Sequence, residues 1–587
     1  MLILDLEKRD YEKVEEEKEK LGVLEVALHY HLNVLKSYEE EPYSKKNDIF
    51  IGTCPFNSPY LPGTHRVTIA FRSPLTGTFF SSTSGGGGYW IMRTGERIFW
   101  IKGKSDIPLI IGINDEKALF FEIEKEKLFE IFRGYKEEKG NKALALFSLE
   151  FLKEHLGGGY RVFCIGPAAF STDFGNVFSC MVTERGILYE DFCGRGGAGS
   201  LLAYKGLAAI AFGGKEENYK AKLGIDAVKK VFSTHGMEYP KAILDATEKY
   251  REKGTFGGNY PKLQHWTIRE NWRMIYENKE KREEVFRERI MDTEWYVKFK
   301  ENVLDKKSSR TCGEPCIATC KKYWDTYKID YEPYQALGLN CGIYLLKDAR
   351  ELVELVDKLG FDAIEMGHIV AFFLELDEKG EVKIDGETRL EKAINVVNQF
   401  YEKNWKNKNL RTISREMGLQ DYAVYIPIGE RWCICPTFYW CIGVLLPLPL
   451  PGKWCTVYEV GHFKEPEEFA KEVFNAGVKE ITYDNFGICR FQRKWIDGII
   501  DDLYFEAYGE RINHLEIGKN LLKKFWKYNE KAGATPVFWE SKRVLDIIRK
   551  LAEEIGTPEW KEKMKEDKGI KEYFDRFFSE YKSLLGV

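Results

Sequence analysis

The chain has 587 residues, with 88 lysines and arginines against 92 aspartates and glutamates and a formal net charge of −4. This length exceeds what one hydrophobic core usually serves, so two to four packed domains are expected. The nearly balanced charge excludes the strong positive field with which proteins gather nucleic acid or an anionic membrane surface.

Residues 1–20 lack the basic start and the apolar core of a secretory signal. The longest apolar stretch, residues 440–450, contains two prolines and is too short to span a membrane. Lysine and glutamate are abundant whereas glutamine occurs five times, a bias associated with hyperthermophilic proteins. We therefore predict a cytoplasmic protein of a hyperthermophile, with no nucleic-acid partner and no membrane partner.

In chain order, a helical stretch is predicted as far as Glu41, and short apolar segments punctuated by glycine follow as far as Gly214. Such segments are typical of strands. The predicted strands are residues 67–72, 98–101, 107–113, 118–123 and 160–165. Residues 1–214 are therefore predicted to form a β-rich base domain.

From Glu216 onward the sequence changes to charged amphipathic helices. In residues 345–359 the apolar positions share one helical face, and Gly360 ends the pattern. No repeat and no low-complexity linker separates the parts, so they are expected to pack around a shared feature. We predict two mainly helical domains, residues 215–418 and 419–587, and hence an α+β fold class.

The strongest chemical signal is a cysteine cluster. Cys312, Cys316 and Cys320 lie within nine residues, and Cys489 follows far downstream. Reducing conditions in the cytoplasm disfavour a disulfide framework among the 13 cysteines. Three clustered thiolates and a remote fourth suit a [4Fe-4S] cubane, in which each iron needs one ligand.

Two other metal chemistries compete with this interpretation. Structural zinc commonly uses two separated close pairs of ligands rather than a triplet and a singleton. A radical enzyme using S-adenosylmethionine has three residues and then two between its cysteines, whereas both gaps here have three. The remaining nine cysteines lie mostly among apolar neighbours, where a buried inert thiol is expected.

Glycine is concentrated in residues 82–88, 157–159 and 194–199. Glycine permits positive φ and lets consecutive N–H groups converge on a phosphate or another anion. The third segment has neither the lysine of a P-loop nor the spacing of a dinucleotide fingerprint. Each segment alone is equally consistent with a plain tight turn.

One short sequence motif, Asp-x-x-Gly-apolar-Asp/Cys, occurs twice, from Asp357 to Asp362 and from Asp484 to Cys489. We call each copy an aspartate phrase. Either copy alone suits a solvated aspartate before a glycine helix cap. Because the phrase occurs twice, and because the candidate cluster ligand Cys489 ends one copy, we favour two similar ligands, one for each copy. Asp357 is predicted in the last turn of its helix, where the dipole disfavours an anion, so a ring rich in N–H donors would compensate.

Together these motifs resemble the aldehyde:ferredoxin oxidoreductase family across most of the chain. The family pattern runs in order through residues 74–78, 82–86, 165–167, 194–199, the cysteine cluster and both aspartate phrases. The resemblance implies a β-rich base domain and two helical domains enclosing a bis-pterin metal cofactor. It implies tungsten or molybdenum held by two pyranopterins, a nearby [4Fe-4S] relay, and oxidation of aldehydes to carboxylic acids.

The resemblance also assigns site residues. Those facing the pterin phosphates are Arg66, Thr83, Gly85, Cys193, Gly194, Gly196 and Gly197, with Mg²⁺ bridging the phosphates through backbone carbonyls near Thr83 and Gly194. Those holding the pterin rings are Asp357, Phe361, Asp362, Asp484 and Ile488, with Lys453 as a further pterin contact. Glu332 matches the catalytic glutamate of the family, although without the resemblance it reads as a loop carboxylate before a proline.

Three departures from the family pattern stand out. Relatives often open the cluster motif with Cys-x2-Cys, whereas three residues separate Cys312 from Cys316 here, and Thr83 stands where asparagine is frequent. Relatives also place a histidine shortly before the pterin-contacting lysine, but none lies between His368 and His462. The proton-transfer role of that histidine is therefore unassigned, and Tyr439 or Trp454 could line the pocket instead.

The missing histidine also bears on partners and on competing functions. Homodimeric relatives use a histidine from the middle of the chain in an intersubunit metal site, so that contact is not expected here. We expect electrons to pass to ferredoxin or to a small multi-cluster iron–sulfur subunit. Reduction of an aromatic acyl-thioester by the same cofactor stays open, as does a non-catalytic electron-transfer subunit, although a cluster alone needs neither the glycine segments nor the aspartate phrases.

Overall fold

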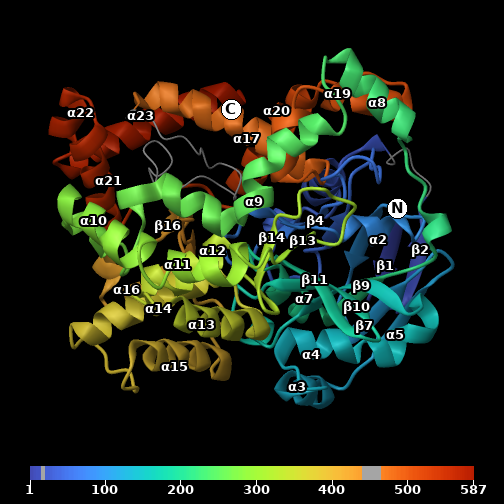
Figure 1. Cartoon of the computed structure of the whole chain (residues 1–587), viewed down its shortest axis with the longest axis horizontal. Coiled ribbons are helices and arrows are strands. Elements are labelled where there is room, and N and C mark those ends of the chain that lie inside the picture. Colours follow the sequence, from blue (N-terminus) through green and yellow to red (C-terminus); the bar gives the residue numbers. More distant parts are fainter. Residues whose placement is uncertain (15–19, 439–463) are drawn as a thin grey trace.

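The computed structural model describes residues 1–14, 20–438 and 464–587. Figure 1 shows the N-terminal sheets, in blue and teal, gathered on one side and helices covering the other side and the top. Lys453, Tyr439 and Trp454 lie outside the described residues, so their predicted roles have no structural counterpart below.

Two six-stranded sheets form the base. The first has the order β2-β1-β6-β3-β4-β5 and the second β11-β10-β9-β12-β7-β8. The first sheet comprises β1 (Leu2–Asp5), β2 (Asp10–Lys13), β3 (Ile49–Gly52), β4 (Val67–Arg72), β5 (Phe79–Ser84) and β6 (Ile98–Lys102). The second comprises β7 (Leu109–Ile113), β8 (Ala118–Glu122), β9 (Gly159–Ile165), β10 (Val177–Thr183), β11 (Gly186–Cys193) and β12 (Leu207–Phe212).

The five strands predicted from the sequence are confirmed as β4, β6, β7, β8 and β9. Every residue of β4, β7 and β12 is buried, so these strands are covered on both faces. The sheets are mixed, because β1 runs parallel to β6 and β12 runs parallel to β7 while the other pairs are antiparallel.

The prediction of helix for the first 41 residues was wrong in part. β1 and β2 form a hairpin there, and helical structure is confined to α1 (Val23–His29) and the short turns after it. The charged composition of β2 reads as a helix, and all four of its residues are exposed. Strand pairing decides instead, since β1 inserts its buried Leu2 and Leu4 beside β6.

Helices dominate the rest of the chain. The helices used below are α9 (Lys241–Leu263), α12 (Tyr331–Leu337), α13 (Leu346–Leu359), α14 (Ala363–Glu378), α15 (Arg389–Glu402), α17 (Pro466–Asn485), α20 (His514–Lys531) and α23 (Asp567–Leu585). α17 packs against α20 and α23, and α12 packs against α14. The helix predicted over 345–359 is α13, and it ends at Gly360, whose φ of 82° is left-handed. The predicted α+β class is therefore confirmed.

One cluster of buried apolar side chains runs from the base through both helical parts, with a smaller cluster around Phe56, Val228 and Trp495. Because the main core is continuous, the boundaries near 214 and 418 stay predictions. Within the described ranges, no helix is both long and apolar enough to cross a bilayer.

Candidate functional site

The four predicted cluster cysteines line one pocket. Cys312, Cys316 and Cys320 lie on the loop between β13 (Ser309–Arg310) and β14 (Lys321–Trp324), and Cys489 follows α17. Burial raises the pKa of Cys320 to about 12 and that of Cys312 well above its usual value. Burial alone therefore favours the protonated thiols, and what distinguishes these cysteines from the other buried ones is that all four line one pocket.

The glycine-rich segment after β5 packs directly against this cysteine loop. A Cβ added to Gly85 would lie 2.8 Å from the sulfur of Cys312, and one on Gly86 would lie 2.0 Å from the Cys312 carbonyl oxygen. Side chains at these two positions would collide with the loop. The glycines therefore allow the base to approach the cysteines closely.

Zinc would require ligands converging on a single ion. Across residues 1–14, 20–438 and 464–587, no three His, Cys, Asp or Glu side chains are arranged to hold one metal ion. Instead, hydrogen bonds reach Cys316, whose sulfur accepts from the Ala318 N–H (3.4 Å) and from the Gln492 amide (3.6 Å). The four thiols line one pocket and supply the donor type that both a [4Fe-4S] cluster and a zinc ion take.

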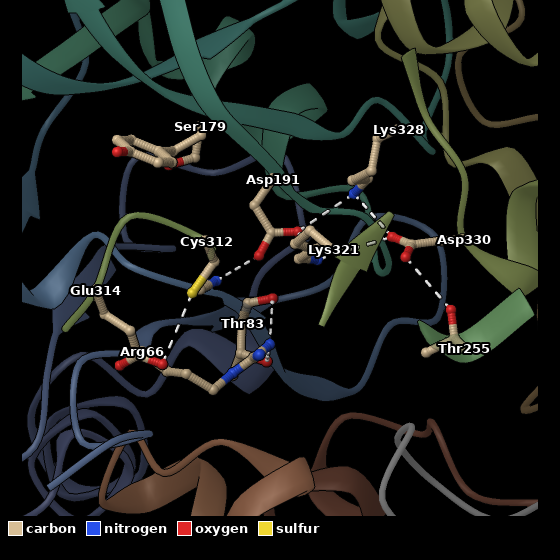
Figure 2. A network of polar contacts seen from close by, with 12 residues as sticks. Arg66, Thr83, Ser179, Asp191, Thr255, Cys312, Glu314, Lys321, Lys328 and Asp330 are labelled. Carbon is tan, nitrogen blue, oxygen red and sulfur yellow. Dashed lines mark hydrogen bonds and ion pairs between the residues drawn. The ribbon is translucent and has the colours of Figure 1, made fainter. Parts of the chain in front are cut away.

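Arg66 connects the cysteine pocket to the predicted phosphate contacts. Its guanidinium donates to the side-chain oxygen of Thr83 (2.8 Å), as Figure 2 shows, and it lines the same pocket as Gly85. Burial opposes the charge of Arg66, but nearby Cys489 and Asp191 raise its pKa. A buried cation with anionic neighbours beside a glycine loop is suited to hold a phosphate.

A charge quartet of Asp191, Lys321, Asp330 and Lys328 extends from this pocket. The carboxylate of Asp191 accepts from the Gly85 N–H (2.6 Å), from Lys321 (2.9 Å) and from Lys328 (3.4 Å). Lys328 also contacts Asp330 (3.0 Å), and Figure 2 shows it between the two carboxylates. The two lysines hold the pKa of Asp191 well below its usual range, despite burial.

Asp330, at one end of the quartet, lies two residues before Glu332, the predicted catalytic residue. It is the residue before α12, whose second residue is Glu332, and it accepts from the Thr255 hydroxyl (3.3 Å). The preceding Tyr331 donates its hydroxyl to the Phe438 carbonyl (2.7 Å). Glu332 is half-buried at the start of the helix. The charge quartet thus runs from the cysteine pocket to Asp330, two residues before Glu332.

The first aspartate phrase is clamped to the second sheet. The Asn176 N–H donates to the Gly360 carbonyl (2.7 Å), and the Asn176 side chain donates to the Phe361 carbonyl (2.7 Å). Asp357 is half-buried and lines a second pocket together with Lys328. Burial raises the pKa of Asp357 to about 7, so a donor-rich ligand there would gain by binding its ionised form.

The second phrase is clamped to the first sheet in the same manner. The Arg66 N–H donates to the Gly487 carbonyl (3.2 Å), and the Thr68 hydroxyl donates to the Asp484 carbonyl (2.6 Å). The Asp484 carboxylate is buried and accepts from the Ser81 hydroxyl (2.9 Å). The glycine cap predicted for each phrase is present, but neither aspartate is a solvated surface residue.

The third glycine segment leads from Cys193 into α7 (Ala198–Lys205) and contains Arg195. Arg195 binds Asp362 (2.8 Å) and Glu365 (2.8 Å), and these anions, with Glu332 among the further contributors, raise its pKa against the effect of burial. A Cβ on Gly194 would meet nothing within 4 Å, so this glycine borders open space.

Gly196 and Gly197 have a packing role. A Cβ on Gly196 would lie 2.5 Å from the ring of Phe80, and one on Gly197 would lie 2.0 Å from the Asp173 carbonyl oxygen. This packing explains why glycine is needed at both positions, and the predicted phosphate contacts of Gly194, Gly196 and Gly197 stay predictions.

Comparison with known proteins gives the family. The model of the aldehyde ferredoxin oxidoreductase N-terminal domain matches residues 1–214, and that of domains 2 and 3 matches residues 245–402. The glyceraldehyde-3-phosphate:ferredoxin oxidoreductase of Pyrococcus furiosus is 37% identical, covering 94% of each chain. This chain belongs to the aldehyde ferredoxin oxidoreductase family.

Other members and a solved structure extend the comparison. An uncharacterised protein of Methanocaldococcus jannaschii is 31% identical over 95% of each chain, and a tungsten-containing aldehyde ferredoxin oxidoreductase of Pyrococcus horikoshii is 26% identical over 58% of this chain and 52% of its own. The active-site complex of benzoyl coenzyme A reductase with 1,5-dienoyl coenzyme A has a TM-score of 0.62 at 14% identity, covering 98% of each chain. That likeness shows the fold alone.

Five charged residues that connect the predicted site residues were not identified from the sequence. Asp191, Lys321, Lys328, Asp330 and Arg195 were not among the predicted site residues, although all five lie within a few positions of predicted motifs. The one available signal was adjacency, since Lys321 follows Cys320 and Arg195 follows Gly194. Adjacency alone does not tell a buried charge from a solvated one.

Proposed function

We propose that this oxidoreductase oxidises aldehydes to carboxylic acids, using a tungsten (or molybdenum) bis-pyranopterin and one [4Fe-4S] cluster that passes electrons to ferredoxin. The observation that carries this proposal is convergence. The cysteine pocket, Arg66 and both clamped aspartate phrases meet on one β-rich base, and a cluster alone needs only the first of these. The name of the 37% identical relative supports an aldehyde substrate, and specifically a phosphorylated one.

The residues present fit these cofactors by donor chemistry. The four thiols that line one pocket, Cys312, Cys316, Cys320 and Cys489, would hold the cluster. The residues that would face the pterin phosphates are Arg66, Thr83, Gly85, Cys193, Gly194, Gly196 and Gly197, with Mg²⁺ near Thr83 and Gly194. Asp357, Phe361, Asp362, Asp484 and Ile488 would hold the rings, because buried carboxylates and carbonyls accept from ring N–H donors.

The net reaction is RCHO + H2O → RCOOH + 2 e⁻ + 2 H⁺. When bound, the metal cofactor accepts the two electrons, chemistry that no side chain of the chain supplies. Glu332 moves one proton from the attacking water or hydrate as a general base. The quartet fixes the start of α12 through Asp330, which sets where the Glu332 carboxylate lies. Single electrons leave by way of the cysteine pocket.

Elemental analysis tests the cofactor proposal directly. Protein produced with tungstate should contain about one tungsten or molybdenum and about four irons per chain, because four thiolates serve one cubane. Zinc without iron would contradict the proposal. Iron without tungsten or molybdenum would also contradict it and would leave the non-catalytic electron-transfer subunit.

Glu332→Gln tests the proton-transfer role. The variant should retain tungsten and iron but lose aldehyde oxidation by roughly 10²- to 10⁴-fold, because the amide keeps the shape and cannot take the proton. Glu351→Gln, at an exposed position on α13, is the matched control and should oxidise aldehydes normally. Near-normal turnover of Glu332→Gln would show that Glu332 is a structural helix-start residue.

Substrate comparison tests the reaction. Glyceraldehyde 3-phosphate should be oxidised with a higher kcat/KM than unphosphorylated glyceraldehyde if the chain shares the substrate class named for its relative. Reduction of benzoyl coenzyme A, with no oxidation of either aldehyde, would replace this proposal with the aromatic thioester alternative.

A further inference from the structure

The cysteine pocket has one side that reaches the surface. Cys312 is 8% exposed, whereas Cys316, Cys320 and Cys489 are half-exposed. Between Cys316 and Cys320 lies Ile317, a large apolar side chain that is 39% exposed. An exposed apolar side chain beside three candidate cluster ligands indicates a contact site for a partner molecule.

Two other segments border the same opening. Phe491 and Gln492 line the pocket, and the ring of Phe491 stacks on that of Tyr250 in α9 (centroids 4.0 Å apart). Helix α9 also touches the cysteine loop, since Lys322 donates to the Arg251 carbonyl (2.5 Å). We define the cluster face as residues 248–253, 316–320 and 489–494.

The cluster face has more basic than acidic residues, although the chain as a whole has a small negative net charge. Residues 248–253 and 489–494 contain six lysines and arginines, Lys249, Arg251, Lys253, Arg490, Arg493 and Lys494, against the two acids Glu248 and Glu252, while the whole chain has a formal net charge of −4. The buried Glu480 binds both Arg490 and Arg493, and Asp484 lies 3.8 Å from Arg490, so two carboxylates balance these two arginines. The excess positive charge of the face therefore comes from residues 249–253 and from Lys494. Lys253 and Lys494 are exposed.

We propose that the cluster face docks a small acidic ferredoxin, with Ile317 as its central apolar contact and the surrounding cations as a steering rim. This inference deepens the proposed function, since it rests on a cluster being present in the cysteine pocket. Complementary charge speeds the encounter of electron-transfer partners, and a small apolar centre gives short-lived contact, which suits repeated single-electron exchange. The face places the partner directly over the half-exposed cysteines, the shortest way out of the pocket.

The test separates ferredoxin from a small dye. Ile317→Ser and the double variant Lys253→Glu/Lys494→Glu are assayed with ferredoxin purified from Pyrococcus furiosus and, in parallel, with benzyl viologen as acceptor. The matched controls are Leu345→Ser, at a position 48% exposed before α13, and Lys383→Glu, on the exposed loop between α14 and α15. Direct binding of the same ferredoxin at low salt is measured by calorimetry, which does not require turnover.

Both cluster-face variants should raise the KM for ferredoxin, the charge reversal by about tenfold, with kcat and the viologen rate unchanged. In the wild type, kcat/KM for ferredoxin should fall as salt rises, and the charge-reversal variant should lose most of that dependence. Calorimetry should show the same loss of affinity. The two controls should match the wild type in every assay.

Equal ferredoxin KM and equal calorimetric affinity in the cluster-face variants and the controls would overturn the docking proposal while leaving aldehyde oxidation with viologen intact. Loss of viologen activity in the wild type would instead overturn the proposed function, and the calorimetry would still decide whether this face binds an acidic partner. A native mass showing a multi-cluster subunit permanently seated on this face would also overturn the transient docking proposed here.

Discussion

Asp191→Asn removes the central charge of the quartet with little change in shape. Its carboxylate contacts Lys321 (2.9 Å), Lys328 (3.4 Å) and the Gly85 N–H (2.6 Å). The side chain of Asp191 is 9% exposed, and those of Lys321 and Lys328 are 13% and 10% exposed. The variant would therefore leave the two lysines with Asp330 as their one remaining ion-pair partner, and Asp357 as a further carboxylate near Lys328.

Breaking a buried ion pair by removing one partner costs about 3–5 kcal/mol. Since about 1.4 kcal/mol corresponds to a factor of ten, local opening around the quartet should become roughly 10²- to 10⁴-fold more frequent. Hydrogen–deuterium exchange of peptides covering residues 311–330 measures this opening without requiring a two-state unfolding of the whole chain. Peptides from α20 and α23, which pack at a distance from the quartet, serve as internal controls.

The stabilisation that Asp191 contributes depends on pH in a direction set by its lowered pKa. Because the two lysines lower the folded-state pKa of Asp191, its contribution is complete above the unfolded-state value and is lost only as the pH falls through the lower folded-state value. The difference between wild type and Asp191→Asn should thus stay constant from pH 6 to pH 9.

A second change isolates the charge balance. Asp191→Asn/Lys321→Gln removes one charge of each sign, so it should exchange more slowly than the sum of the two single variants predicts. If Asp191→Asn exchanges within tenfold of the wild type, or if the double variant is simply additive, the quartet is solvent-relaxed and the electrostatic argument fails.

Three further predictions concern the cluster and the aspartate phrases. Cys489→Ser should reduce iron content and alter the cluster's electron paramagnetic resonance spectrum while tungsten stays bound, and loss of tungsten alone would contradict its assignment. Asp357→Asn should raise the melting temperature of the cofactor-free protein relative to wild type increasingly between pH 4 and pH 7, because a pKa raised to about 7 makes ionisation destabilising over that range; a pH-independent difference would argue against it. Gly360→Ala should lower the melting temperature and the tungsten content, because Gly360 has a left-handed φ of 82° and a Cβ there would lie 2.8 Å from the Gly166 backbone. In the control Gly380→Ala, φ is 77° and the surrounding space is open, so that variant measures the conformational cost alone.

The strands and helices that the sequence predicted are those whose apolar pattern is local. β4 and β9 are mostly apolar and buried segments, and α13 has its apolar residues on one helical face and ends at Gly360. The hairpin of β1 and β2 was missed because the charged β2 has no such stripe. Its conformation comes from pairing with β1, which itself depends on β6, more than 80 residues away in the sequence. Pairing at that range has no local signature.

The candidate site divides in the same way. Cys312, Cys316 and Cys320 were recognisable because cluster ligands have a short spacing, and the aspartate phrases because they recur. Lys321 and Lys328 look like the solvated lysines common in this chain, and only the folded arrangement shows them on either side of Asp191. Their burial depends on β11, on the loop of β14 and on α12 meeting, which is a tertiary property.

The two aspartate phrases are related by more than sequence. Each lies at the end of a helix, α13 or α17, and in each the residue after the glycine donates to the residue before the aspartate, Phe361 to the Val356 carbonyl (3.1 Å) and Ile488 to the Tyr483 carbonyl (2.8 Å). The glycine carbonyl of each accepts a backbone N–H from a different sheet of the base.

This matched pair of clamps accounts for the doubled phrase without invoking a ligand for the glycines, but it does not account for the carboxylates. Within each phrase the helix cap and the clamp use only backbone groups, so neither depends on the aspartate carboxylate. A carboxylate kept at both ends, buried in one case and with a pKa of about 7 in the other, is costly to the fold by itself. The Ser81 hydroxyl (2.9 Å) and Arg490 (3.8 Å) offset part of this cost for Asp484. Burial raises the pKa of Asp357, so a donor bound there would stabilise its ionised form.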